Sequence, residues 1–234
     1  MTRTFTLDLH VHTNYSHDGH DSIERIIEVA RAQGLDGLAI CDHNTMAGVH
    51  AARDYLAAHD LDLLIIPGIE VTTVQGHLLV LGLEEGVERD MTAVETIRAV
   101  RQYEREHAQS IVIIAPHPYH PFRHSIGTLC THQDIEAIEV FNSRYFTGLG
   151  NLWARRTAKR TGKIAVAGSD AHSADCVGLA TVTVDVDADE LARMVDYRAI
   201  VKALKAGSVR VTAMKRTPFC LYLSQLCKKK RRRD

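Results

Sequence analysis

Side chains that bind metal ions crowd the first twenty residues of this chain. The segment DLHVHTNYSHDGH, residues 8 to 20, contains four histidines and two aspartates directly after an apolar run of strand type. A single histidine is usually a hydrogen-bonded or surface residue, but six imidazole and carboxylate groups within thirteen residues need a chemical reason. Divalent cations bind these two kinds of side chain. The density therefore favours a metal site at the end of the first strand.

The alternation of residues in this first strand predicts one polar face and one apolar face. Successive side chains of a strand point to opposite sides. Polar groups on a buried strand are costly unless they are paired or bind a cation. We expect two sets of residues on opposite faces: Asp8, His10 and His12 on the polar side, and Leu7, Leu9 and Val11 on the packed side.

Similar residues recur where later strands are predicted to end. The runs CDH, GIE, APHP and GSDAH each close an apolar segment, and GHLLVLG opens one with a histidine. In α/β barrels the active site is assembled at the carboxyl ends of the strands, because each loop there delivers side chains to a common mouth. Residues far apart in sequence can therefore meet. The candidates outside the first segment are His43, Glu70, His77, His117, Asp170 and His172.

The chemistry of this set favours more than one transition-metal ion. It offers imidazole and carboxylate groups without a thiolate, which suits Zn²⁺, Mn²⁺ or Fe²⁺ better than Ca²⁺. Six histidines and three carboxylates exceed the ligands that one four-coordinate ion can use. Each motif alone has an ordinary structural explanation, such as a helix cap for GSDAH, but their shared position at strand ends indicates a site with two or three ions.

The elements that would position these residues alternate along the chain. Short apolar runs are followed by segments of helical period, the pattern of βα units around a largely parallel sheet. TTVQG, between the third and fourth strands, predicts a hairpin. Expected strands span residues 4–12, 35–43, 61–71, 77–83, 110–118, 135–143, 163–172, 179–186 and 208–214. Expected helices span residues 21–34, with Asp21 as N-cap, and 45–59, 90–109, 148–161 and 188–206.

Composition places the chain among ordinary globular proteins. Of its 234 residues, 45% are hydrophobic and 24% are charged, both near the averages for that class. Its apolar runs fall short of the roughly 18 residues of a membrane-spanning helix. The start of the chain is polar where a signal peptide has an apolar core, and the five cysteines form no CxxC pair. We therefore expect a cytoplasmic protein without a membrane partner.

A single domain over residues 1–214 is the simplest division of the chain, because no Gly/Ser-rich or Pro-rich linker interrupts it. Residues 215–234 form a C-terminal extension that ends in KKKRRRD, with six positive charges and one negative. The rest of the chain is mildly acidic, since the whole has a net charge of −1. Such a basic end can attract nucleic acid, but it is more commonly a solvated, disordered terminus.

Taken together, the motifs DLHVHTNYSHDG, CDHNT, PGIEV, GHLLVLG, APHP and GSDAH resemble those of the polymerase and histidinol phosphatase (PHP) family of metal-dependent phosphoesterases. The resemblance covers most of the chain. It implies a distorted seven-stranded (β/α) barrel, TIM-like in type, that holds up to three metal ions. It also implies three sets of ligands: His10, His12 and Asp170 with Glu70 as a bridge, then Glu70, His77 and His117, and finally Asp18, His43 and His172.

One position departs from the motifs of that family. Many relatives have Ser-Asp-Gly after the first two histidines, whereas this chain has SHDG, with His17 inserted before Asp18. Either side chain could bind the third ion, and we favour Asp18.

Residues outside the ligand set are candidates for handling the substrate. Arg144 and Arg123 follow strand ends and could bind a phosphate, with Arg144 preferred, although a surface ion pair is an equal alternative for each. His120 or His124 could protonate a leaving group or simply lie in a solvated loop. Two aspartates are expected to orient ligand histidines without binding metal themselves: Asp8 and Asp42.

These features predict hydrolysis of a phosphate ester. Clustered divalent ions activate water at neutral pH and neutralise charge on phosphoryl oxygens, so no covalent intermediate is required. The expected partner is a small phosphorylated metabolite or nucleotide. Alternatives are a hydrolase of a cyclic ester or amide, a nuclease acting on phosphodiesters, for which the basic tail is the only support, and a metal-stabilised accessory module without activity.

Overall fold

Strands and helices alternate along the computed structural model, which describes residues 1–193 and 197–223. The strands are β1 (Thr2–Val11), β2 (Gly37–Ile40), β3 (Leu64–Thr72), β4 (His77–Leu81), β5 (Val112–Ala115), β6 (Ala137–Asn142), β7 (Ile164–Gly168), β8 (Ala180–Asp187) and β9 (Val209–Met214). The α-helices are α1 (Ile23–Ala32), α2 (Ala47–His59), α3 (Ala93–Glu106), α4 (Leu149–Thr161), α5 (Ala188–Arg193) and α6 (Tyr197–Lys205). Two 3-10 helices, η1 (Gly127–Thr131) and η2 (Ala174–Cys176), lie in the loops after β5 and β7.

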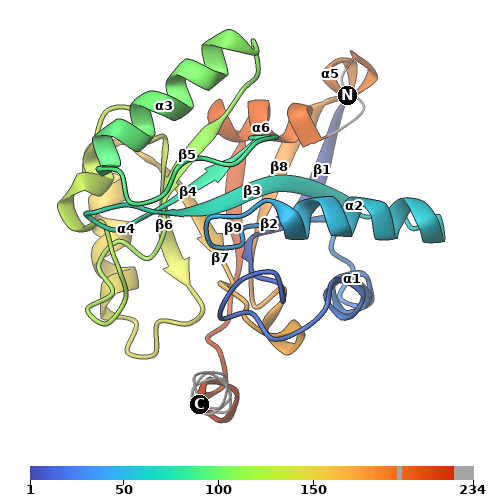
Figure 1. Cartoon of the computed structure of the whole chain (residues 1–234), viewed down its shortest axis with the longest axis horizontal. Coiled ribbons are helices and arrows are strands. Elements are labelled where there is room, and N and C mark those ends of the chain that lie inside the picture. The colour runs from blue at the N-terminus through green and yellow to red at the C-terminus, as the bar shows by residue number, and fades with distance from the viewer. Residues whose placement is uncertain (194–196, 224–234) are drawn as a thin grey trace.

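The sheet curls into a nearly closed barrel. Its strand order is β7-β6-β5-β4-β3-β2-β1-β8-β9. Just after β7, Ala171 pairs with Val11 at the end of β1, and the His12 backbone N–H donates a hydrogen bond to the Ala171 carbonyl at 2.8 Å. This contact brings β7 back to β1, and helices lie around the outside (Figure 1). The structure therefore confirms the predicted α/β barrel.

Antiparallel pairing is more common than the sequence predicted. Four neighbouring pairs are parallel, β1–β2, β2–β3, β5–β6 and β6–β7, and four are antiparallel, β1–β8, β3–β4, β4–β5 and β8–β9. The connection between β3 and β4 is too short for parallel pairing, which needs a crossover of about a dozen residues. The resulting hairpin confirms the turn predicted at TTVQG. It pairs His77 with Thr72, two residues beyond Glu70.

The prediction of two strictly alternating faces in β1 is wrong. The pairing of β1 with β2 shifts register between Asp8 and Val11, as at a β-bulge. Leu7 and Leu9 pack in one core with β8 and α6, whereas Val11 packs in a second core with α1 and α2. Because a bulge reorients the residues that follow it, the alternation read from the sequence ends before His10.

The helices largely match their predicted ranges. α1 buries one face, formed by Ile23, Ile26, Ile27 and Ala30. Its N-cap is Ser22 and not Asp21, because the Asp21 carboxylate accepts a hydrogen bond from the Ala174 backbone N–H at 2.7 Å and so ties this end of α1 to the loop after β7. The helix predicted over residues 188–206 is described as two helices, α5 and α6.

The first part of the C-terminal extension packs beside the turn after β6. The Thr217 N–H donates to the Ser143 carbonyl at 2.9 Å, and the rings of Phe146 and Phe219 are 5.1 Å apart. The basic run at residues 228–234 lies outside the described residues. The division of the chain at residue 214 stays a prediction. Within the described part of the chain, no helix has both the length and the apolar character needed to span a membrane.

Candidate metal centre

The nine predicted ligands converge at one end of the barrel. Seven are buried, and the other two, His43 and His77, are partly buried. Within the described residues, potential donor atoms lie within 4.8 Å of one another in three groups: His12, Asp18, His43 and His172; His10, His12 and Glu70; and His43, Glu70 and His77. Because His12, His43 and Glu70 each belong to two groups, the groups form one continuous centre.

Glu70 lies in the middle of this centre. It is fully buried near the end of β3, where both of its carboxylate oxygens face imidazole nitrogens. Oε2 lies 3.4 Å from His10 Nε2, 3.1 Å from His12 Nε2 and 3.5 Å from His43 Nε2. Oε1 lies 2.9 Å from His77 Nδ1 and 3.0 Å from His117 Nε2. One carboxylate is thus shared by five imidazoles, as a bridging ligand would be.

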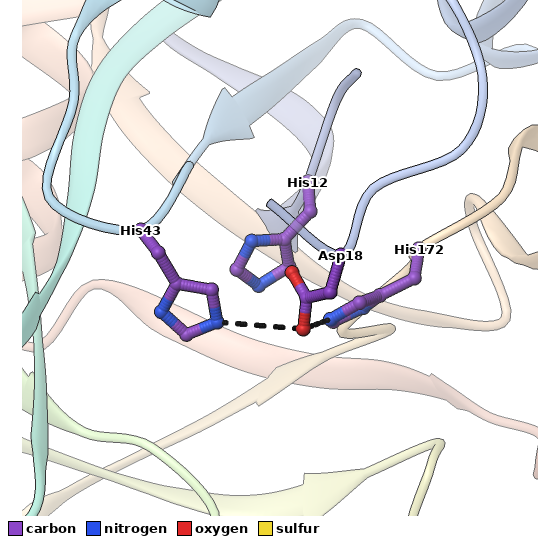
Figure 2. A group of neighbouring side chains, drawn as sticks. All are labelled: His12, Asp18, His43 and His172. Carbon is purple, nitrogen blue, oxygen red and sulfur yellow. Dashed lines mark hydrogen bonds and ion pairs between the residues drawn. The ribbon is translucent and has the colours of Figure 1, made fainter. Parts of the chain in front are cut away.

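Asp18 occupies a second position between imidazoles. Its Oδ2 lies 2.9 Å from His172 Nε2 and 3.7 Å from His43 Nε2, with the His12 ring nearby (Figure 2). The side chain of His17 is 63% exposed, and its Nε2 lies 4.0 Å from the same carboxylate. The geometry therefore favours Asp18 over His17 as the ligand.

Asp170 and His117 border the three groups and share an unusual backbone. Both adopt the left-handed region, with φ of 52° and 31°, which is uncommon for residues other than glycine and concentrates at functional sites. Asp170 Oδ1 lies 3.6 Å from His12 Nε2 and 3.3 Å from His172 Nδ1. These contacts place Asp170 among the other predicted ligands.

Electrostatics keeps most of these groups in the form that binds metal. Burial lowers the pKa of His12 and His117, lowers that of His172 well below its usual range, and lowers that of His43 to about 3, so these imidazoles are neutral. Burial opposes ionisation of Glu70 and Asp18, but the surrounding histidines outweigh it and lower the pKa of both carboxyls. Neutral imidazoles and ionised carboxylates are the species that ligate cations.

The residues present fit divalent cations. Nε2 of His10 and Nε2 of His12 are 3.1 Å apart, and both lie near the same oxygen of Glu70. Asp170 Oδ1 is buried and has no hydrogen-bond partner among the described residues, which is costly for a carboxylate oxygen. A cation among these atoms would give Asp170 Oδ1 an oppositely charged partner. It would also accept the lone pairs of the two imidazole nitrogens, which would otherwise face each other.

His10 is held from behind by a carboxylate that the sequence reasoning missed. Its Nδ1 lies 3.0 Å from Oε1 of Glu139, in β6. The second oxygen of Glu139 accepts hydrogen bonds from the His117 backbone N–H at 2.7 Å and from Asn142 Nδ2 at 2.8 Å. Burial opposes protonation of His10, but Glu139 and Glu70 outweigh it and raise the pKa of His10 to about 9. The sequence feature that could have identified Glu139 is its position inside a strand predicted to be buried, where a charged side chain is unusual.

Both arginine candidates lie at the centre, beside Asp170. The Arg123 guanidinium contacts Asp170 Oδ2, to which Asn142 Nδ2 also donates at 2.9 Å. Arg144 Nη1 lies 3.9 Å from Asp170 Oδ1, and its Nε has no hydrogen-bond partner among the described residues. Burial, then repulsion from Arg123, lowers the pKa of Arg144 to about 9, so its guanidinium is charged at neutral pH.

The remaining candidates lie close by in different settings. His120 is buried, and burial, followed by Arg123 and Arg144, lowers its pKa to about 4. His124 Nε2 is 2.8 Å from the Thr73 carbonyl, which it can hydrogen-bond as a donor.

The two aspartates expected to orient ligand histidines contact backbone and hydroxyl groups, and Asp8 accepts a hydrogen bond from the His10 backbone N–H at 3.3 Å. Asp42 accepts hydrogen bonds from the Thr13 N–H and hydroxyl at 2.7 Å each. Asp8 accepts from the backbone N–H groups of Ser169 at 3.0 Å and Gly178 at 2.8 Å. These two carboxylates hydrogen-bond the backbone near predicted ligands, whereas the imidazole of His10 is contacted by Glu139.

Comparison with known protein families finds one match over most of the chain. The model of the PHP domain matches residues 8–175, and a second model, described as PHP-associated, matches residues 148–209. The first match contains all nine predicted ligands.

Three curated relatives match parts of the chain. An uncharacterized protein of Methanocaldococcus jannaschii is 32% identical over 62% of this chain and 85% of its own length. A phosphoribosyl 1,2-cyclic phosphate 1,2-diphosphodiesterase of Eggerthella lenta is 40% identical over 34% of this chain and 31% of that enzyme. A 5'-3' exoribonuclease of Haemophilus influenzae is 40% identical over 31% of this chain and 25% of that enzyme. The match therefore spans less than a third of either enzyme.

Among solved structures, a two-domain protein from Bacteroides vulgatus, described as containing a predicted PHP-like metal-dependent phosphoesterase, superimposes with a TM-score of 0.70. It is 17% identical, and the match covers 91% of this chain and 66% of that one. At this identity the likeness concerns the fold.

Proposed function

The chain belongs to the PHP domain family, and we propose that it is a metal-dependent phosphoesterase that hydrolyses a small phosphorylated compound at the centre around Glu70. The observation that carries the proposal is the position of the Glu70 carboxylate, which faces five imidazoles while fully buried. A buried carboxylate among so many imidazoles fits a site for two or three divalent ions, here Zn²⁺, Mn²⁺ or Fe²⁺.

Different sets of the predicted ligands would bind different ions. Glu70 would bridge two of them, because its oxygens face separate sets of histidines. Asp18, with His43 and His172, would hold another. Ions at such a site supply an activated water at neutral pH and neutralise charge on phosphoryl oxygens. Glu139 would keep His10 oriented by accepting a hydrogen bond from its Nδ1.

The basic residues beside Asp170 would bind the substrate. Arg123 and Arg144 would bind phosphoryl oxygens, since a guanidinium matches phosphate in shape and charge. His120 would donate a hydrogen bond toward the leaving group as a neutral imidazole, because its lowered pKa leaves few protonated rings at neutral pH. With these roles, the phosphate would bind beside Asp170, where both arginines lie.

A phosphodiester is the second candidate substrate. It is favoured by the matched segments of a cyclic phosphate diphosphodiesterase and of an exoribonuclease. A nucleic acid would then be a substrate as well as a partner. The monoester remains our first proposal, because both matched segments cover less than a third of those enzymes.

The test compares p-nitrophenyl phosphate, bis(p-nitrophenyl) phosphate, a single-stranded RNA and a lactone with protein supplied with Mn²⁺ or Zn²⁺. We expect the monoester to be hydrolysed fastest and Asp170→Ala to lose at least ~100-fold in turnover. Glu88→Gln, an exposed change away from the centre, serves as the matched control. Unchanged turnover in Asp170→Ala, or faster hydrolysis of the lactone, would rule out the proposed function.

A further inference from the structure

A cavity of about 540 Å³ opens beside the metal centre. This volume lies within the range of roughly 300–1,000 Å³ that is usual for small-molecule sites. Four aromatic residues and two prolines form much of its wall: Tyr119, His120, Tyr145, Trp153, Pro118 and Pro121. The roles proposed for the ligands and the arginines do not use this space.

The cavity and the metal centre are built from adjacent residues of the same two loops. In the loop after β5, His117 faces the metal centre, and the next residue, Pro118, lines the cavity. In the turn after β6, Arg144 lies beside Asp170, and the next residue, Tyr145, lines the cavity. A molecule with its phosphate at the centre would therefore reach this cavity with its remaining part.

Two residues of the cavity wall, Ser125 and His120, contact His117. Oγ of Ser125 lies 3.4 Å from Nδ1 of His117, and the His120 backbone N–H donates to the His117 carbonyl at 3.1 Å. The His120 ring is 4.4 Å from the Tyr145 ring. Nδ1 of His120 accepts a hydrogen bond from the Phe122 backbone N–H at 3.2 Å, which places the proton of the neutral ring on Nε2. His120, which lines the cavity, therefore offers a hydrogen-bond donor at Nε2.

The shape of the wall suits a planar group. A Cβ at Gly150 would lie 2.3 Å from Cε1 of Tyr145, so glycine lets α4 approach this ring closely. The Tyr119 hydroxyl already pairs with Thr157 Oγ1 at 3.0 Å, which leaves its ring for packing. Trp153 is 61% exposed, so its ring is open to contact with a ligand in the cavity.

We propose that this cavity binds a planar aromatic ring carried by the leaving group of the phosphate ester, as the base of a nucleotide would be. Aromatic side chains stack on planar rings, and this contact is more favourable than contact with a flexible alkyl chain. The inference rests on the proposed function, because the phosphate at the metal centre directs the ring into the cavity. It narrows the substrate class to phosphate esters of ring-bearing alcohols such as nucleosides.

Paired substrates test the proposal. AMP and ribose 5-phosphate share a phosphorylated ribose and differ by the base, and hexyl phosphate offers apolar bulk without a ring. We expect kcat/KM for AMP to exceed that for both other compounds by roughly tenfold or more. Equal values for AMP and ribose 5-phosphate, or an equal gain with hexyl phosphate, would overturn the ring site.

Variants on α4 separate stacking from general damage. Trp153→Ala should remove most of the advantage of AMP over ribose 5-phosphate, whereas Trp153→Phe should keep most of that advantage. Leu152→Ala, a change at an exposed neighbour that does not belong to the cavity wall, should behave as wild type. An advantage of AMP that survives Trp153→Ala undiminished would contradict the proposal.

Binding can be followed without turnover, because Trp153 is the single tryptophan of the chain. Titration with AMP should change its emission saturably, whereas ribose 5-phosphate should not, with free tryptophan as the control for light absorbed by AMP. This signal is expected even if the protein hydrolyses neither compound, which would refute only the proposed function. Emission that stays constant up to millimolar AMP would refute the ring site itself.

Discussion

Glu139 Oε1 lies 3.0 Å from Nδ1 of His10, and both residues are buried. This contact fixes the imidazole from behind, so that its Nε2 stays near Glu70. The other oxygen of Glu139 accepts a hydrogen bond from the backbone of His117. One carboxylate that does not belong to the predicted ligand set therefore positions two residues that do.

Replacing this carboxylate should weaken metal binding while the fold is kept. Glu139→Gln preserves the size of the side chain but removes the charge that favours the Nδ1 proton of His10. We expect metal affinity and turnover to fall by about 10- to 100-fold. Metal titration and circular dichroism would check this, with Glu88→Gln as the control. Wild-type metal affinity in Glu139→Gln would show that the contact is dispensable.

Gly168, at the end of β7, should not tolerate a methyl group. A Cβ there would lie 2.5 Å from Cβ of His10 and 2.6 Å from Oε1 of Glu139. We expect Gly168→Ala to lower the free energy of unfolding by about 1–3 kcal/mol and to reduce bound metal. Gly86→Ala, which has no atom within 4 Å of its new Cβ, is the matched control. Urea unfolding that gives equal stabilities for the two variants would contradict the close approach.

The arginines beside Asp170 should act mainly on phosphate binding. Arg144→Gln removes a partly buried guanidinium 3.9 Å from Asp170, and we expect KM to rise about tenfold or more with a smaller change in kcat. Inhibition by inorganic phosphate should weaken in parallel, whereas Arg31→Gln, an exposed change on α1, should leave both unchanged. A loss confined to kcat would instead assign Arg144 to another role.

Glu104, which is remote from the metal centre, should make the free energy of unfolding depend on pH in the acidic range. Burial alone would raise the pKa of Glu104, but hydrogen bonds from Lys205 and the Ile111 backbone outweigh it and lower this pKa below its ordinary value of 4.5. Its stabilising contribution is therefore complete above about pH 4.5 and is lost as the pH falls through the folded-state value.

Glu104→Gln should accordingly lower the free energy of unfolding by about 1 kcal/mol at neutral pH, and the gap to wild type should narrow as the solution becomes more acidic. Urea unfolding at a series of pH values measures this gap. A difference that stays constant, or that widens on acidification, would contradict the sign of the shift.

The convergence of the nine predicted ligands could be foreseen from sequence because each of them has a local signature. His43, His117 and Asp170 all follow short apolar runs, and parallel strands bring their carboxyl ends together whatever their separation in the chain. The position of His77 could also be predicted, although it begins an antiparallel strand, because the turn residues TTVQG predict a hairpin that brings this strand back to β3.

Features that depend on tertiary contacts were not predictable in the same way. The bulge between Asp8 and Val11 accompanies the pairing of Val11 with Ala171, a contact made only when the barrel closes. Glu139 lies in a run that reads as a buried strand, and only the cost of burying its charge marked it. The cavity near Trp153 arises from two loops whose shapes no periodic pattern records.

The most direct test of the central claim is to count the ions held by Glu70. Mass spectrometry of protein saturated with Mn²⁺ or Zn²⁺ and then freed of excess metal should find two or three ions per chain in the wild type. Glu70→Gln keeps the side-chain volume but removes the shared carboxylate, so it should lose at least one ion. A wild-type chain that retains none, or a Glu70→Gln chain that retains as many as the wild type, would contradict the account.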